Sequence, residues 1–344
     1  MILVSSISCW KKKKERKQKK SETKKKNTVS TLMKTWKELE PNFFLTRTRN
    51  GLSNTESLGD RIGKGANNAV YKIRDTSNGS EKIERVLRRP LKRSDTRNKG
   101  SAKREAMYTV LASEKNISPI VFDSWYEKES TDTKRKGLYM ISEKFDFDIE
   151  HLIDKDLPYF MTKIPDMREQ LRIHLESIVN LGLFNYDIKP LNIVCKRDPQ
   201  FRFSFIDFGV DYCERLEDAE SESLPFKESN HRFLRELITF CKKEGMYHRI
   251  RWVMMVVMCI IFSMHMHELM LEKKVHRTTA WRCNFAGSLC SDMRRASDEK
   301  DMKLITWCLE NKILRKVLTH YFEMDGMSRQ EGSDFMMVFS QFKR

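Results

Sequence analysis

The stretch that decides the fold reads Asn185-Tyr186-Asp187-Ile188-Lys189-Pro190-Leu191-Asn192-Ile193, and Phe205-Ile206-Asp207-Phe208-Gly209 follows it. It combines two carboxylates, one lysine and one carboxamide in the pattern D-x-K-P-x-N plus D-F-G. Asp207 lies twenty positions after Asp187, and the apolar run from Phe203 to Ile206 is typical of a β-strand that carries it. A D-F-G triplet alone is common by chance, but at this spacing the two motifs support each other.

These side chains are the ones that phosphoryl transfer needs: a carboxylate to accept a hydroxyl proton, a cation over the moving phosphoryl group, and oxygen ligands for Mg²⁺. The stretch resembles the catalytic and metal-binding loops of the eukaryotic-type protein kinase family. The resemblance implies that Asp187 is the catalytic base, that Lys189 steadies the γ-phosphate of ATP, and that Asn192 and Asp207 bind Mg²⁺. The plainer alternative is that Asp187 and Asp207 are loop-capping carboxylates in an unrelated fold.

A glycine-rich turn lies upstream, within a strand–turn–strand pattern from Leu58 to Tyr71. Gly63 and Gly65 fill the first two places of G-x-G-x-x-G, and Asn68 fills the third. Glycine lets a backbone approach phosphates because it has no Cβ, and the turn is similar to the family's phosphate-covering loop. Taken alone, a G-x-G is more often a plain hairpin.

The strand that follows carries the residue expected to hold the ATP phosphates. Asn78-Gly79 predicts a hairpin, because both residues accept positive φ, and the return strand then spans 82–89. Val86 occupies the place of the family's small apolar residue, which sets Arg88 where the family's lysine points. Arginine keeps the charge but is longer and planar. Lys82 or Lys92 remains the alternative to Arg88.

A helix predicted over 101–113, with Ser101 as its N-cap, places Glu105 as the partner of Arg88. The alternative for Glu105 is a surface glutamate in an i, i+4 pair. The strand predicted over 137–143 resembles the one that leads into the kinase hinge, so Ser142 would be the gatekeeper. The backbone from Glu143 to Phe145 would then bind the adenine edge. The resemblance implies further nucleotide contacts from apolar side chains, namely Ile62, Val70, Val86 and Val194.

Size and composition fit one catalytic unit of two lobes, since 344 residues with 40% hydrophobic content can bury a large core. The resemblance implies an α+β, bilobal kinase-like domain over 55–344. Its small β-rich N-lobe would cover 55–143, and its mainly helical C-lobe 146–344. The thirteen-residue apolar run from Trp252 to Met264 is too short for a membrane span and predicts a buried core helix. The family's usual aspartate at the start of this helix is missing.

The N-terminal part has a different character. Between Lys11 and Lys26 there are eleven Lys or Arg residues and two Glu, which is +9 of the chain's +17. Self-repulsion predicts a disordered basic arm over 1–40 and a linker over 41–54. The arm would contact nucleic acid, nuclear import factors or anionic surfaces, or it would only aid solubility. The apolar residues at its start precede the basic block, which is the reverse of a secretory signal.

Cysteine usage favours a reducing compartment, because eight cysteines occur without a C-x-x-C pair. An intracellular location in the cytoplasm or nucleus follows. The divergent C-terminal half and the basic arm resemble kinases encoded by large DNA viruses, which implies host or virion proteins as substrates.

Three functions compete for this chain: a Ser/Thr protein kinase acting on protein hydroxyls, a small-molecule kinase of the aminoglycoside or choline type, and a pseudokinase scaffold. Lys189, two places after Asp187, is the family's Ser/Thr mark, and the K-P pair argues against a small-molecule kinase. Retention of Asp187, Asn192 and Asp207 argues against a pseudokinase. Asn185 and Tyr186 replace the family's His and Arg, and no A-P-E triplet follows, so the sequence predicts activity independent of loop phosphorylation.

Overall fold

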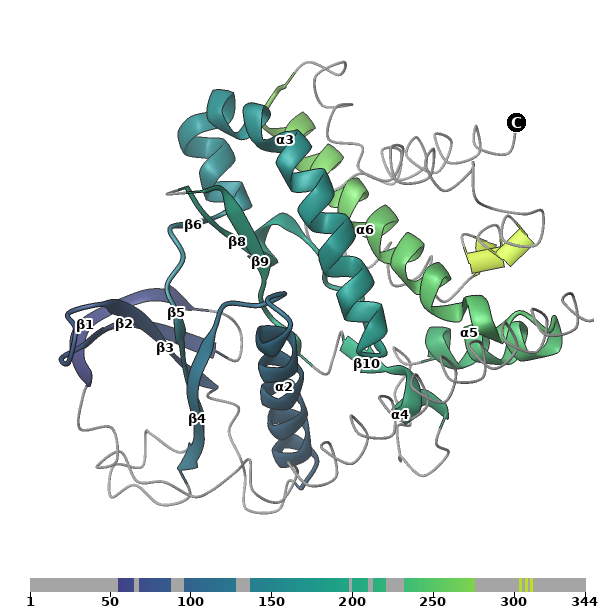
Figure 1. Ribbon diagram of the computed structural model, residues 1–344, viewed down its shortest axis with the longest axis horizontal. Helices are drawn as coiled ribbons and strands as arrows, with labels where there is room; N and C mark the ends of the chain where they lie inside the picture. The colour runs from purple at the N-terminus through teal and green to yellow at the C-terminus, as the bar shows by residue number, and fades with distance from the viewer. Residues whose placement is uncertain are drawn as a thin grey trace, which may run out of the picture.

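The computed structural model describes residues 55–64, 68–87, 96–127, 137–197, 200–209, 213–220 and 232–275, with short pieces at 303–304, 307–308 and 310–311. Helices and strands occur together in these ranges, which confirms the predicted α+β class (Figure 1). The basic arm, the linker, Gly65 and Arg88 lie outside the described residues.

A five-stranded antiparallel sheet forms the first part of the described chain. The strands run in the spatial order β1-β2-β3-β5-β4. Their bounds are Thr55–Lys64 for β1, Asn68–Asp75 for β2, Glu81–Leu87 for β3, Val121–Glu127 for β4 and Gly137–Glu143 for β5. The strand predicted over 137–143 is therefore confirmed, and β1 and β2 match the strand–turn–strand pattern around the glycine-rich turn.

The hairpin predicted from Asn78-Gly79 joins β2 to β3 and is also confirmed. Only Gly79 of the pair takes a positive φ, of 71°, in the region that favours glycine. Its amide donates to the Asp75 carbonyl at 2.8 Å, and the Asp75 amide donates to the Ser80 carbonyl at 2.9 Å. The turn is thus longer than a two-residue loop.

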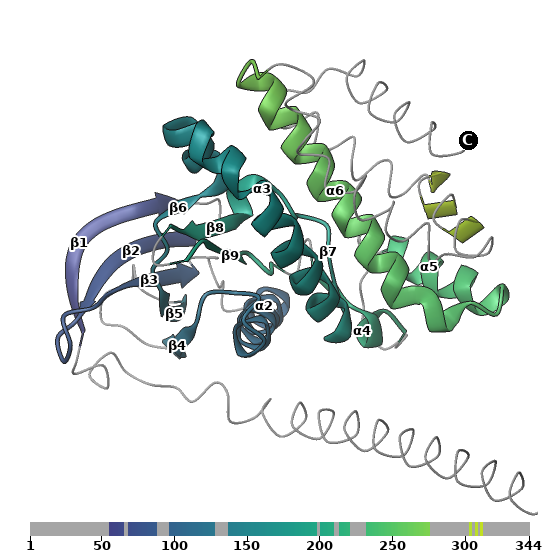
Figure 2. The ribbon, with the colours of Figure 1, turned by 45° about the horizontal axis from the view of Figure 1, so that its top comes forward.

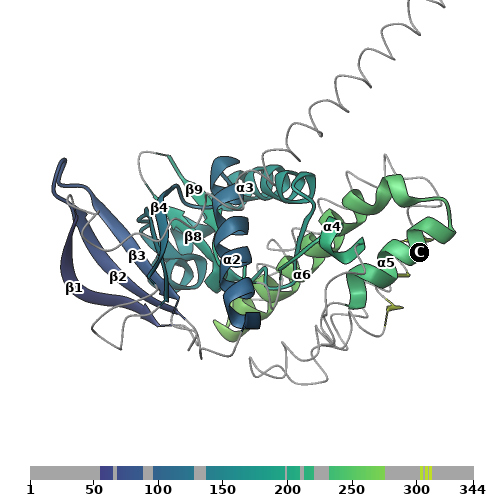
Figure 3. The ribbon, with the colours of Figure 1, turned by 90° about the horizontal axis from the view of Figure 1, so that it is seen from below.

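Helix α2 spans Thr96–Glu114 and packs beside β4 and β5. Seen from below, α2 lies between the sheet at one end of the molecule and helix α5 at the other (Figure 3). The predicted start at Ser101 is wrong, because the helix continues through Gly100 to Thr96. Glycine inside a helix costs about 1 kcal/mol relative to alanine, and this helix tolerates it.

The second part of the chain is mainly helical. Its long helices are α3 (Ile149–Asn180), α5 (Arg232–Lys243) and α6 (Ile250–Glu272). Helices α3 and α6 pack side by side (Figures 1 and 2). Helix α3 is kinked at Asp156, whose φ of −154° is not helical and whose carboxylate accepts the Tyr159 amide at 3.1 Å. Asp156 thus caps the second segment of α3, which Pro158 begins well because proline suits a helix's first turn.

Short elements connect the two parts. A three-stranded sheet has the order β6-β8-β9, and β7 pairs antiparallel with β10. The bounds are Phe147–Asp148 for β6, Leu183–Asn185 for β7, Pro190–Asn192 for η2, Ile193–Lys196 for β8, Arg202–Phe205 for β9, Cys213–Arg215 for β10, Leu216–Glu220 for α4 and Tyr247–Arg249 for η4. The apolar strand expected before Asp207 is therefore confirmed as β9.

Helix α6 is the central helix of the main core, as the run from Trp252 to Met264 predicted. Within the described ranges, Tyr247–Glu272 is the one helical stretch with the length and apolar composition of a membrane span. Its most apolar window is 83% buried inside the protein, which is the burial expected of a core helix. Of the cysteines in the described ranges, five are free and buried: Cys195, Cys213, Cys241, Cys259 and Cys308.

A matched pair of substitutions tests the role of α6. Ile261 has 0% of its surface exposed in α6, whereas Ile173 in α3 is 45% exposed. We expect Ile261→Ala to lower the free energy of unfolding by about 2–5 kcal/mol, because it leaves a cavity. Ile173→Ala should change it by less than about 0.5 kcal/mol. Chemical denaturation monitored by circular dichroism measures both, and equal costs would contradict a core position for α6.

Candidate active site

The loop between β7 and β8 buries Asp187 and holds it through hydrogen bonds at both its backbone and its side chain. The Asp187 amide donates to Asn185 Oδ1 at 2.8 Å. Asn192 Nδ2 donates to the Asp187 carbonyl at 2.9 Å and to Asp187 Oδ2 at 2.7 Å. Both bonds from Asn192 use its amide nitrogen, so they do not engage its Oδ1 oxygen, the atom that a cation would take.

The charge of Asp187 is set by its surroundings. Burial raises the pKa of its carboxyl above the usual range, the negative charge of Asp207 raises it further, and Lys189 and Asn192 oppose this effect. The Lys189 ammonium lies 3.1 Å from Asp187 Oδ1. That oxygen accepts no well-aligned hydrogen bond from the described residues. Asp187 therefore combines burial, a raised pKa and a lysine partner, a combination that is common at functional sites.

Asp207 lies two positions after the end of β9. It takes a φ of 64°, in the left-handed region that few non-glycine residues adopt. Aspartate tolerates this conformation better than most residues, and such strain is concentrated at functional sites. Two residues later, a Cβ at Gly209 would lie 3.3 Å from Asp207 Oδ1 and 3.9 Å from Glu105 Oε2. The missing side chain of Gly209 thus leaves room for two carboxylates that approach the same point.

Glu105 comes to this point from helix α2, where only 3% of its surface is exposed. The alternative, in which Glu105 is a surface glutamate, is therefore wrong. The structure brings Glu105 to Asp207, although its expected partner Arg88 lies outside the described residues. Lys82, the alternative to Arg88, forms an ion pair with Asp75 and lies 4.3 Å from the centre of the Phe122 ring. Its ammonium is thus engaged at the β2–β3 hairpin.

The sequence did not reveal how the loop is anchored to the core. The amide of Asn185 donates to the Met258 sulfur of helix α6 at 3.4 Å. A thioether is a weak acceptor, but the contact is buried and the methionine also fills the apolar space below the loop. Met258 therefore provides an anchor in a helix that lacks the expected aspartate.

The residues expected to contact a nucleotide lie on neighbouring strands. Gly63 of β1 is opposite Val70 of β2, and Val86 of β3 is paired with the residue before Val70. Ile62 is 51% exposed, as a residue that covers a ligand would be before binding. Ser142 in β5 is buried, and Val194 in β8 is half-buried.

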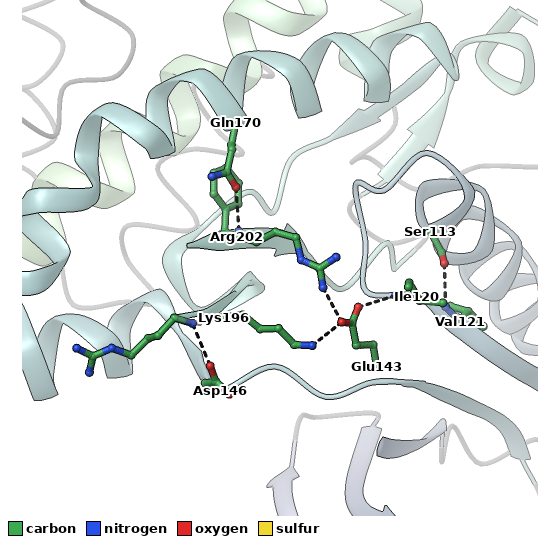
Figure 4. Close-up of polar contacts among 10 residues, drawn as sticks. Ser113, Ile120, Val121, Glu143, Asp146, Gln170, Lys196 and Arg202 are labelled. Carbon is green, nitrogen blue, oxygen red and sulfur yellow. Dashed lines mark hydrogen bonds and ion pairs between the residues drawn. The ribbon is translucent and has the colours of Figure 1, made fainter. Parts of the chain in front are cut away.

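Glu143 carries a cluster of charges that sequence reasoning missed (Figure 4). Its Oε1 lies 2.5 Å from both Lys196 Nζ of β8 and Arg202 Nη2 of β9, while its Oε2 accepts the Ile120 amide at 3.4 Å. The two cations also lie over the Phe145 ring. One carboxylate thus joins the end of the five-stranded sheet to the β8–β9 hairpin.

The backbone of Glu143, which was expected to bind the adenine edge, is itself hydrogen-bonded within the protein. The Glu143 amide donates to the Ile120 carbonyl at 2.8 Å, so this N–H is already used within the protein. Of the predicted stretch from Glu143 to Phe145, the Glu143 N–H is therefore not available as a donor to a ligand.

The oxygen atoms of Asp207 and Asn192 are of the kind that Mg²⁺ binds, but they are too few to hold the ion without further ligands. Within the described ranges, no group of three or more His, Cys, Asp or Glu side chains is placed to hold a metal. Mg²⁺ bound with a nucleotide needs only one or two carboxylates, because phosphates and water complete its shell. Asp187 is buried, Asp207 is half-buried, and the charge of Asp207 raises the pKa of Asp187. A cation beside Asp207 and Asn192 would offset this repulsion.

Comparison with known proteins leaves the family of the chain open, since neither the family models nor the curated proteins searched give a match.

The Glu143 cluster predicts a pH-dependent stability. Burial raises the Glu143 pKa, but the hydrogen bond from Lys196 and the charge of Arg202 outweigh burial and leave the pKa below its usual value of 4.5. A depressed pKa stabilises the fold above the unfolded-state value, and this stabilisation disappears as the pH falls through the folded-state pKa. Glu143→Gln should therefore lower the free energy of unfolding at neutral pH, and its difference from wild type should shrink below pH 4.5.

Urea denaturation between pH 3.5 and 7.5 measures this difference. Glu176→Gln is the control, because the Glu176 side chain is 58% exposed and a surface pair contributes little. A pH-independent cost of Glu143→Gln would show that the carboxylate's charge does not matter.

Proposed function

We propose that the protein is a serine/threonine kinase that transfers the γ-phosphate of Mg-ATP to protein hydroxyls. The observation that carries this proposal is the buried Asp187, which Asn192 and Lys189 hold and on which the charge of Asp207 acts. Glu105 and Asp207 both approach Gly209. The D-x-K-P-x-N and D-F-G motifs favour the same reading from the sequence.

The arrangement supports a division of roles among these residues. Asp187 would accept the proton of the attacking hydroxyl, because its buried carboxylate has a raised pKa, which suits a general base. Lys189, 3.1 Å from that base, would steady the γ-phosphate as charge moves onto it. Asp207 and Asn192 would hold Mg²⁺, which neutralises phosphate charge when ATP is bound. Glu105 would orient the cation of the third strand.

The architecture is compatible with a two-lobed, kinase-like fold. The five-stranded sheet and α2 would form the N-lobe over 55–143, and the helical part would form the C-lobe from residue 146 onward. The hinge would then lie between β5 and β6, where the Glu143 cluster ties the two parts together. The proposed substrate is a protein, and the basic arm would supply contacts to anionic partners.

Phosphate transfer from radiolabelled Mg-ATP to a basic protein mixture tests the proposal. Wild type should label Ser or Thr, while Asp187→Ala and Asp207→Ala should lose about 10²-fold or more of the rate. Asp166→Ala is the matched control, because the Asp166 side chain in α3 is 56% exposed and far from the loop in sequence.

Each other outcome has a definite meaning. Label on small hydroxyl compounds but not on protein would indicate a small-molecule kinase. ATP binding without transfer would indicate a scaffold. Thermal unfolding of all variants shows whether a lost rate reflects lost folding.

A further inference from the structure

The segment that follows the D-F-G triplet is fastened to the candidate active site from two sides. Strand β10 (Cys213–Arg215) pairs antiparallel with β7, which leads into the Asp187 loop, and helix α4 (Leu216–Glu220) follows directly. The Cys213 amide donates to the Gly209 carbonyl at 2.8 Å, and the Leu216 amide donates to the Gly182 carbonyl at 2.7 Å. The position of this segment and that of the loop therefore depend on each other.

Two side-chain hydrogen bonds, or ties, hold this segment. The first comes from Tyr186, the neighbour of Asp187. Its hydroxyl donates to Glu214 Oε2 at 3.1 Å, and both residues are buried. Burial, followed by the charge of Glu214, raises the Tyr186 pKa well above its usual value, so the phenol keeps the proton it donates. Its ring packs edge-on against Phe184, with ring centres 4.6 Å apart. Tyr186 stands where protein kinases have an arginine. It thus replaces a charged hydrogen-bond donor with a neutral one.

The second tie comes from Tyr108 in helix α2. Its hydroxyl donates to Asp218 Oδ2 of α4 at 3.0 Å, and only 2% of Tyr108 is exposed. Tyr108 lies three positions after Glu105, so both side chains leave the same face of the helix. A shift of α4 away from Tyr108 would therefore remove one of the contacts that position the helix carrying Glu105.

We propose that Tyr108 and Tyr186 are positioning residues, which hold the Glu105 helix and the Asp187 loop in their working arrangement through the carboxylates of Asp218 and Glu214. The inference rests on the proposed kinase function and adds a mode of regulation to it. Hydrogen bonds to ionised acceptors are among the strong ones, and here the unmodified chain supplies both partners of each. The segment is thus ordered without a phosphate group, in contrast to activation loops that phosphorylation orders.

Tyrosine-to-phenylalanine variants of the full chain test the inference, because each removes one hydroxyl and keeps the ring. Tyr186→Phe should lower kcat by about tenfold or more and change the KM for Mg-ATP by less than about twofold, because Asp187 does not bind ATP. Tyr108→Phe should lower kcat and also raise the KM, since Glu105 approaches Asp207 on the metal side. In both variants, amide exchange over 213–220 should accelerate.

Tyr159→Phe is the matched control, because its hydroxyl contacts the Arg197 carbonyl at 3.5 Å and takes no part in either tie. It should keep wild-type kinetics and exchange. A double-mutant cycle of Tyr186→Phe with Glu214→Gln should show non-additive losses, since both changes break one hydrogen bond. Active wild type with both tyrosine variants at wild-type kcat would overturn the inference. Inactive wild type would overturn the proposed function, and the exchange rates would still test the ties.

Independence from phosphorylation gives a second readout. Phosphatase treatment of wild type, and the change of Ser221 and Ser223 to Ala, should each leave kcat within about twofold. A large loss in either experiment would show that a phosphate group, rather than the two tyrosines, holds the segment.

Discussion

The burial of one carboxylate, Asp187, is the constraint on which the rest of the structure depends. A buried charge destabilises the fold unless it is paired and hydrogen-bonded. The partner groups must therefore be held in fixed positions around it. Asn192, Lys189 and Asn185 meet this demand from positions within seven residues of each other. Their loop needs a fixed base, which helix α6 gives through Met258 and through its apolar surface.

The same constraint explains how distant parts of the chain converge on the loop. Strand β10 holds β7, Tyr186 binds Glu214, and Tyr108 extends the connection to helix α2. Helix α2 in turn carries Glu105 to the point beside Gly209 where Asp207 lies. On the opposite side, Glu143 joins the sheet to β8 and β9, the hairpin that connects Asn192 to Asp207. Each contact therefore limits movement of the site in a different direction.

The sequence predicted those features that depend on local pattern. The strand at 137–143, the Gly79 turn and the buried helix α6 follow from alternation, turn chemistry and an apolar run, and the structure confirms them. The start of α2 was missed because Ser101, a residue type that often caps helices, lies inside this one. Met258, the Glu143 cluster and the tyrosine ties could not be read from one sequence. Their partners lie 28 to 110 positions apart, and only the packing of whole elements decides which polar groups meet.

A crystal structure with Mg²⁺ and a non-hydrolysable ATP analogue tests the central claim most directly. The account predicts Mg²⁺ about 2.1 Å from an oxygen of Asp207 and from Asn192 Oδ1, with the γ-phosphate beside Lys189 and adenine against the Phe145 backbone. A nucleotide bound elsewhere, or Asp207 and Asn192 turned away from a bound Mg²⁺, would contradict the assignment of this site.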